Sequence, residues 1–208
     1  MKIIAHRGMW FSKNEQNTLV AFERALKNGF GIETVFRDFN GSLVISHDLP
    51  LENALKAGFF FDLCNQYSSA GPHAINVKSD GLQMLLAQYL QLWHFEKYFI
   101  FDMSIPDTIG YLKSGLNVYS RVSEYEKFQN FDGKTAGIWL DAFEKEWYSV
   151  DEINNYHFAG QAIAIVSPEL HGRDYKSVWA MIKKIKLPQM NIMLCTDLPL
   201  EAQEYFDE

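Results

Sequence analysis

Short apolar runs rich in β-branched residues recur along the whole chain, and each precedes a polar turn and a segment with helical spacing. Eight runs are typical of strands: Lys2–Ala5, Gly31–Phe36, Ala74–Val77, Tyr98–Phe101, Asn117–Tyr119, Gly137–Leu140, Ala162–Val166 and Asn191–Leu194. Divided by eight, the 208 residues give about 26 per unit, close to the least that one strand, one helix and two loops occupy. The pattern predicts an α/β fold, a compact (β/α)8 TIM barrel that forms one domain over residues 1–208.

Helices are predicted between these strands. The segments with helical spacing are 17–28, 81–92, 106–114, 123–129, 149–156, 174–186 and 199–206, and a short extra strand is predicted at Leu43–Ser46. Asn17 and Thr18 precede the first amphipathic run, and Gly29 follows it, as is typical of a capped helix. Ser123 with Glu126 is a similar start signal for the fourth helix.

Composition excludes several classes of protein. Lys and Arg number 19 against 26 Asp and Glu, and a net charge of −7 argues against a general binder of nucleic acid. Cys64 and Cys195 lie far apart, outside any metal-binding motif, which argues against a disulfide framework or a zinc site. No apolar stretch approaches a membrane span, and the N-terminal apolar run is broken by His6 and Arg7, unlike a signal peptide. We expect a cytoplasmic protein with a small-molecule partner.

Ionisable residues follow nearly every predicted strand. They are His6, Arg7, Glu33, Arg37, His47, Asp48, Lys78, Asp80, Asp102, Arg121, Glu124, Asp141, Glu169, His171 and Asp197. Because the strands of such a barrel all end at the same face, where active sites form, these side chains are predicted to surround one pocket.

Two histidines in such a pocket suffice for acid–base chemistry. His6 and His47 are candidates for a general base and a general acid. One base and one acid are the minimum set of catalytic groups for cleaving a phosphodiester through an activated oxygen nucleophile. Arg7 and Lys78 would then hold the phosphate. Arg121, Glu169 and His171, which follow later strands, are candidates for binding the rest of the substrate.

The first 48 residues carry ordered motifs of a known family. They are Ile4-Ala5-His6-Arg7-Gly8, Asn17-Thr18-Leu19 with Ala21-Phe22 and Ala25, Gly31-Ile32-Glu33, Asn40-Gly41 and His47-Asp48. In these motifs the chain resembles the glycerophosphodiester phosphodiesterases, whose wider grouping includes bacterial phosphatidylinositol phospholipases C and shares a (β/α)8 barrel. The segment Ile75-Asn76-Val77-Lys78 resembles the third-strand motif of the family.

The resemblance implies a role for each matching residue. His6 and His47 would be the acid–base pair, Arg7 and Lys78 would contact the phosphate, and Glu33 would bind a divalent cation, Mg²⁺ or Ca²⁺.

The cation site departs from the family pattern at two positions. Val35 stands where the family has an aspartate two residues after the glutamate, and Asn76 stands where it has a carboxylate two residues before the lysine. Gln16 also replaces the usual glutamate before Asn17. An amide offers a hard cation only a neutral oxygen.

Three interpretations of the departures remain open. Asp80 and Asp102 could supply the missing carboxylates and rebuild a cation site with Glu33. The site could instead work without a metal, with Arg37, on the same face of its strand as Glu33, in place of the cation. Or the barrel could bind a phosphorylated metabolite without turnover.

The sequence favours an enzyme. We expect a phosphoric diester hydrolase that acts on a small glycerophosphodiester or sugar-phosphate diester by acid–base catalysis with His6 and His47. The alternative is a catalytically degenerate barrel that only binds.

Overall fold

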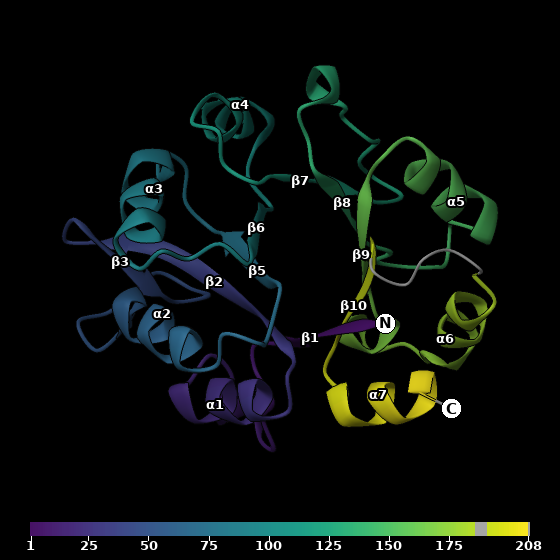
Figure 1. The fold of residues 1–208 in the computed structure, drawn as a ribbon, viewed down its shortest axis with the longest axis horizontal. Helices are drawn as coiled ribbons and strands as arrows, with labels where there is room; N and C mark the ends of the chain where they lie inside the picture. Colours follow the sequence, from purple (N-terminus) through teal and green to yellow (C-terminus); the bar gives the residue numbers. More distant parts are fainter. Residues whose placement is uncertain (186–190, 208) are drawn as a thin grey trace.

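The computed structural model describes residues 1–185 and 191–207, and its central feature is a closed barrel of eight parallel strands (Figure 1). The strands are β1 (Lys2–His6), β2 (Gly31–Phe39), β5 (His73–Val77), β6 (Tyr98–Phe101), β7 (Tyr119–Val122), β8 (Gly137–Leu140), β9 (Ala162–Val166) and β10 (Ile192–Thr196). Hydrogen bonds join β1 to β2 and to β10, and a single parallel bridge between Ile100 and Val118 joins β6 to β7 and closes the ring. The predicted (β/α)8 barrel is confirmed.

Helices surround the barrel strands in Figure 1. They are α1 (Leu19–Lys27), α2 (Ala57–Gln66), α3 (Gln83–Leu92), α4 (Ile105–Lys113), α5 (Val150–Phe158), α6 (Lys176–Lys183) and α7 (Pro199–Asp207). Side chains of Thr18, Ser104 and Ser149 accept backbone hydrogen bonds at the starts of α1, α4 and α5, as the capping patterns require. Within the described part of the chain, no helix is long and apolar enough to cross a membrane.

Six of the seven predicted helices are confirmed. The structure differs from the prediction at α2, which is an additional helix, and at residues 123–129, which form no helix. Residue 186, the last of the predicted helix 174–186, lies outside the described residues. Helix α2 was not predicted, although its buried residues, Ala57, Phe60, Phe61 and Cys64, have the i, i+3, i+4, i+7 spacing of one helix face.

The predicted helix 123–129 is wrong. The Ser123 hydroxyl does accept hydrogen bonds from the backbone N–H groups of Tyr125 and Glu126, as in a helix cap. However, the Ser123 N–H donates back to the Glu126 carbonyl over 2.9 Å and closes a tight turn. The Glu126 carboxylate accepts from Arg121 at 2.6 Å instead of returning to the Ser123 backbone. The second half of the capping box is therefore missing.

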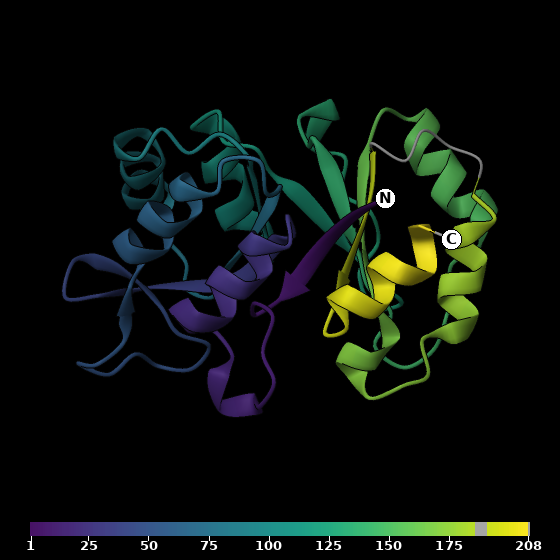
Figure 2. The ribbon, with the colours of Figure 1, turned by 60° about the horizontal axis from the view of Figure 1, so that its bottom comes forward.

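Strand β2 continues past the barrel into a hairpin with β3 (Ser42–Ile45), which in turn pairs with β4 (Leu55–Lys56). Asn40 and Gly41 at its tip both have positive φ, 50° and 76°, which is typical of a two-residue hairpin turn. Figure 2 shows this extension beside α2 and α3. Because the hairpin reverses the chain, β3 ends near the barrel mouth and is followed there by His47.

Apolar side chains fill the barrel interior below the mouth. They are Ile4, Ala74, Phe99, Phe101, Tyr119, Trp139, Ala164, Val166, Met193 and Cys195. Phe99 stacks on Tyr119, and Phe101 on Trp139, each with ring centroids 3.9 Å apart. A second, larger cluster packs the outer faces of the strands against the helices. The interior is therefore a packed core that supports the strand ends.

His73 is a buried histidine that the sequence analysis did not single out. Its Nδ1 atom accepts a hydrogen bond from the Ile32 N–H at 3.2 Å, and its ring stacks on Phe95 at 5.3 Å. Burial, together with the positive charge of Lys97, lowers its pKa to about 3. A neutral His73 thus joins β5 to β2.

This histidine is expected to make stability depend on pH. Between pH 6.5 and about 3 the unfolded chain binds a proton at His73 that the folded chain does not, so stability falls as pH decreases. The slope approaches ~1.4 kcal/mol per pH unit. His73→Asn keeps an acceptor but cannot titrate, so between pH 6 and pH 5 the wild type should lose about 1 kcal/mol more unfolding free energy than this variant. Urea unfolding at both pH values measures the difference, and equal losses would contradict the assignment.

Candidate active site

A cavity of about 350 Å³ lies at the C-terminal ends of the barrel strands. It is lined by His6, Arg7, Glu33, His47, Asn76, Lys78, Phe101, Asp102, Arg121, Trp139, Asp141, Phe143, Val166, Leu170 and His171. Nine of the fifteen ionisable residues predicted to surround one pocket line it. The six that do not are Arg37, Asp48, Asp80, Glu124, Glu169 and Asp197. The barrel therefore brings most of the candidate residues to one pocket.

His6 ends β1 and lies between two carboxylates. Register places His6 beside Glu33 on β2, and places Ala5 beside Thr196 on β10, so that Asp197 follows next to His6. His6 Nδ1 is 2.7 Å from Asp197 Oδ1, and its Nε2 is 3.9 Å from Glu33 Oε2. The Asp197 contact fixes the ring orientation, because a carboxylate holds the protonated nitrogen and leaves the other one free for chemistry.

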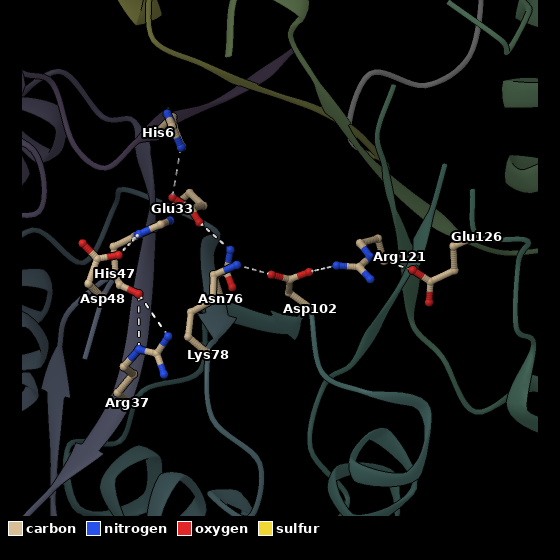
Figure 3. Close-up of polar contacts among 10 residues, drawn as sticks. All are labelled: His6, Glu33, Arg37, His47, Asp48, Asn76, Lys78, Asp102, Arg121 and Glu126. Carbon is tan, nitrogen blue, oxygen red and sulfur yellow. Dashed lines mark hydrogen bonds and ion pairs between the residues drawn. The ribbon is translucent and has the colours of Figure 1, made fainter. Parts of the chain in front are cut away.

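Glu33 is buried with only part of its hydrogen-bonding capacity used. Its side chain is 3% exposed, and Oε1 accepts a hydrogen bond from Asn76 Nδ2 at 3.1 Å. Its Oε2 atom and the Asn76 Oδ1 atom are buried and accept no hydrogen bond from the protein, although Oε2 lies within ion-pair distance of His6. Figure 3 shows Glu33 between His6 and Asn76. Two acceptor oxygens therefore remain free for a ligand.

His47 lies at the open side of the cavity. Its side chain is 49% exposed, and Nδ1 is 2.9 Å from Asp48 Oδ1. The Arg37 guanidinium donates two hydrogen bonds, of 3.2 and 3.1 Å, to the His47 carbonyl oxygen (Figure 3). Arg37 therefore braces the loop that carries His47 and does not line the cavity.

Arg7 turns the chain sharply after β1. Its φ is +57°, its N–H donates to the Glu33 carbonyl at 2.9 Å, and its carbonyl accepts from the Asn17 N–H at 3.0 Å. The guanidinium donates to Gln16 Oε1 at 3.1 Å, while its Nε is buried without a protein partner. Gln16 therefore has a structural role in positioning Arg7.

Three charged residues form a chain across the wall opposite His6. Lys78 and Arg121 each bind one oxygen of the Asp102 carboxylate, from opposite sides in Figure 3. Arg121 Nε also donates to Glu126 at 2.6 Å. Burial acts to lower the pKa of Arg121, but the hydrogen bond to Glu126 and the charge of Asp102 outweigh it, and the pKa is raised. Lys78 and Arg121 are thus both held at the cavity by carboxylates.

His171 forms another histidine–aspartate pair at the cavity wall. Its Nε2 is 2.7 Å from Asp141 Oδ1, and its ring packs against Phe143 at 5.0 Å. The ring therefore has a fixed place beside the aromatic floor of Phe101 and Trp139. Each of the three cavity histidines, His6, His47 and His171, is paired with an aspartate.

Glu169, predicted to bind substrate, and Asp80, predicted to bind a cation, lie outside the cavity and have other contacts. The Glu169 carboxylate accepts hydrogen bonds from the Ser167 and Thr196 hydroxyls and from the Asp197 N–H, and so it joins the ends of β9 and β10. The exposed Asp80 carboxylate accepts from the Ser104 hydroxyl at 3.3 and 3.4 Å. Both residues stabilise loops at the strand ends.

The fold of this chain is similar to that of several solved structures. No protein-family model and no curated protein matches the sequence. Among solved structures, the chain is similar to a glycerophosphodiester phosphodiesterase from Agrobacterium tumefaciens, at 17% identity and a TM-score of 0.72, over 98% of this chain and 99% of the other. The chain has the fold of the glycerophosphodiester phosphodiesterases.

Two further structures support this fold assignment. A glycerophosphodiester phosphodiesterase from Parabacteroides distasonis matches with a TM-score of 0.69 and 18% identity, over 99% of this chain and 96% of the other. A Ca²⁺-dependent phosphatidylinositol-specific phospholipase C from Streptomyces antibioticus matches with a TM-score of 0.58 and 8% identity, over 99% and 95%. The chain thus resembles phosphodiesterases by its motifs in the first 48 residues. It resembles them by its fold over 98–99% of its length.

The phosphodiesterase resemblance also implies a divalent cation beside Glu33, and the residues present fit it poorly. Among residues 1–185 and 191–207, no three His, Cys, Asp or Glu side chains lie together in a way that could hold a metal ion, so Glu33, Asp80 and Asp102 do not form a shared site. Val35 is 1% exposed within the apolar core. The Glu33 carboxylate and the Asn76 amide each offer one buried oxygen without a hydrogen bond, whereas Mg²⁺ and Ca²⁺ prefer several oxygen ligands with strong negative charge.

The sequence analysis missed some cavity residues and most of the pairings. Asp141 and Asp197 were noted only as strand-end carboxylates, and Phe143 and Leu170 were not singled out. A polar residue after each strand was the available signal. The partner of each residue depends on strand register and loop shape, which spacing alone does not give.

Proposed function

We propose that the chain hydrolyses small phosphodiesters of the glycerophosphodiester or sugar-phosphate type. The observation that carries the proposal is the placement of His6, oriented by Asp197, in one cavity with His47 and the cations Lys78 and Arg121. The likeness to solved phosphodiesterases supports it at the level of fold. The proposal treats residues 1–208 as one phosphodiesterase-like domain.

His6 is proposed as the general base. With Nδ1 held by Asp197 at 2.7 Å, Nε2 is the nitrogen left to take a proton from a substrate hydroxyl. That hydroxyl oxygen attacks phosphorus, and the bond from phosphorus to the leaving alcohol breaks. A cyclic phosphodiester and a free alcohol result.

His47 is proposed as the general acid. It lies at the open mouth, half-exposed, where it gives a proton to the leaving alkoxide and is left neutral. In the second half of the reaction water opens the cyclic ester with the two roles reversed. The sum is a diester and one water consumed, and an alcohol and a phosphomonoester formed.

The other cavity residues are proposed to bind the substrate. Arg7, Lys78 and Arg121 carry the positive charge that a phosphate requires. His171, paired with Asp141, lines the cavity together with Phe101 and Trp139. It would contact the alcohol part of the diester. Both cysteines, Cys64 and Cys195, are buried and unpaired, so the proposal places the reaction in the reducing cytoplasm.

A panel of glycerophosphodiesters with different alcohols tests the proposal. Alcohol release is measured by coupled assay with EDTA, and again with Mg²⁺, Mn²⁺ or Ca²⁺. We expect at least one member to be hydrolysed by the wild type, and the activity to be lost in His6→Ala. Binding of these diesters with no turnover under any of the conditions would contradict the proposal and favour a non-catalytic barrel.

A further inference from the structure

The cavity has a deficit of negative charge at the place where relatives would hold a cation. Glu33 contributes a carboxylate oxygen that accepts no hydrogen bond, and Asn76 contributes a neutral amide oxygen. Val35, the register partner of Asn76 on β2, adds an apolar side chain buried in the core. A Mg²⁺ or Ca²⁺ ion at this place would keep most of its ligands as water and would meet a single full negative charge.

The nearby carboxylate that could correct the deficit is already used. Both oxygens of Asp102 are bound, one by the Lys78 ammonium and one by the Arg121 guanidinium. A divalent cation on Asp102 would have to displace one of these groups or remain beside their positive charges. The arrangement therefore disfavours a cation and supplies positive charge of its own.

This arrangement is firmly held. Asp102 has a φ of +75°, a conformation that non-glycine residues adopt at a cost and only where their surroundings impose it. Its side chain is 11% exposed, and Glu126 holds Arg121 from the other side at 2.6 Å. The two cationic side chains are thus fixed before any ligand binds. Less side-chain entropy is therefore lost when they bind a phosphate.

We infer that Lys78 and Arg121, held on Asp102, take the place of the divalent cation in binding the substrate phosphate. This inference rests on the proposed function. An ammonium has three N–H donors and a guanidinium five, so both keep donors for phosphate oxygens after binding Asp102 and Glu126. Both line the cavity that His6 also lines, whereas Arg37, the replacement cation in one of the three interpretations of the sequence, donates to the His47 carbonyl.

The test is phosphate binding without metal. Calorimetry in EDTA, with sn-glycerol 3-phosphate as the probe, should show binding by the wild type. Lys78→Met and Arg121→Met should each weaken it tenfold or more, because each removes a charge-assisted contact. Lys27→Met is the matched control, since Lys27 pairs with Glu23 on α1 and its loss should leave binding unchanged. Thermal melting checks that each variant folds.

A second measurement separates this inference from the proposed function. Mg²⁺ and Ca²⁺ are titrated into the wild type and into Glu33→Gln, and diester hydrolysis is followed in EDTA and with each ion. Hydrolysis only with a divalent ion, together with tight ion binding that Glu33→Gln abolishes, would overturn the inference and leave the proposed function standing. Metal-free phosphate binding that depends on Lys78 and Arg121, with no diester hydrolysed, would support the cation pair and contradict the proposed function.

One decisive result needs the wild type alone and so does not depend on whether a variant folds. If the wild type does not bind the probe in EDTA but binds it with Ca²⁺ or Mg²⁺, the fixed cations do not replace the metal.

Discussion

Replacing His6 with alanine should lower kcat on a cleaved glycerophosphodiester by about 10²–10⁴-fold, the usual cost of losing a general base. The fold should survive, because His6 lines the cavity and does not belong to the apolar interior. Steady-state kinetics with circular dichroism measures both effects. His94→Asn is the matched control, since His94 lies outside the cavity at the end of α3, with a positive φ that asparagine tolerates. Activity of His6→Ala within a few-fold of the wild type would contradict the assignment.

Asp197 gives the same prediction a second readout. Asp197→Asn should reduce kcat less than His6→Ala does, because the amide still contacts His6 Nδ1 but no longer fixes the tautomer by its charge. As Asp197 is a positioning residue, the pH profile of kcat should change shape in this variant. An unchanged profile would indicate a purely structural contact.

Replacing His47 with alanine should cause a loss of similar size, about 10²–10⁴-fold. Arg37 binds the backbone carbonyl of His47 and not its ring, so the loop should keep its place in the variant. If His47 is the general acid, a substrate with a p-nitrophenol leaving group, which leaves without protonation, should largely restore the rate of His47→Ala. The same substrate should not restore His6→Ala.

Two comparisons decide this second prediction. Equal losses on both substrates in His47→Ala would rule out the general-acid role. Restoration of His6→Ala by the activated substrate would reverse the two assignments. Added imidazole gives a further check, because His47 is half-exposed at the mouth and its empty place is open to solvent.

The sequence could predict the barrel because strand signals repeat at near-equal spacing. Tyr98–Phe101, Gly137–Leu140 and Ala162–Val166 were predicted with the bounds observed. Helix α2 was missed although the sequence carries its signal, because Ala57, Phe60, Phe61 and Cys64 have helical spacing and form its buried face. The cap signal at Ser123 failed because a neighbouring side chain competed: Arg121, five residues before Glu126, binds the carboxylate that the expected cap would use.

The site could be predicted as a set of residues but not as a set of contacts. Strand ends gave nine cavity residues, because all parallel strands end at one face. Nothing in the spacing indicated that Asp102 binds Lys78 and Arg121, or that Glu169 turns away to the Thr196 hydroxyl. Those choices depend on side-chain geometry between strands far apart in sequence.

The most direct test of the central claim is a phosphorus NMR time course of a glycerophosphodiester with the wild-type protein in EDTA. The proposed mechanism predicts that the diester resonance declines, that a cyclic phosphodiester resonance rises and then falls, and that a phosphomonoester accumulates in its place. The same sample with His6→Ala should retain the diester. A diester resonance that persists unchanged with the wild type, with EDTA and with added Mg²⁺ or Ca²⁺, would contradict the claim that this chain is a phosphodiesterase.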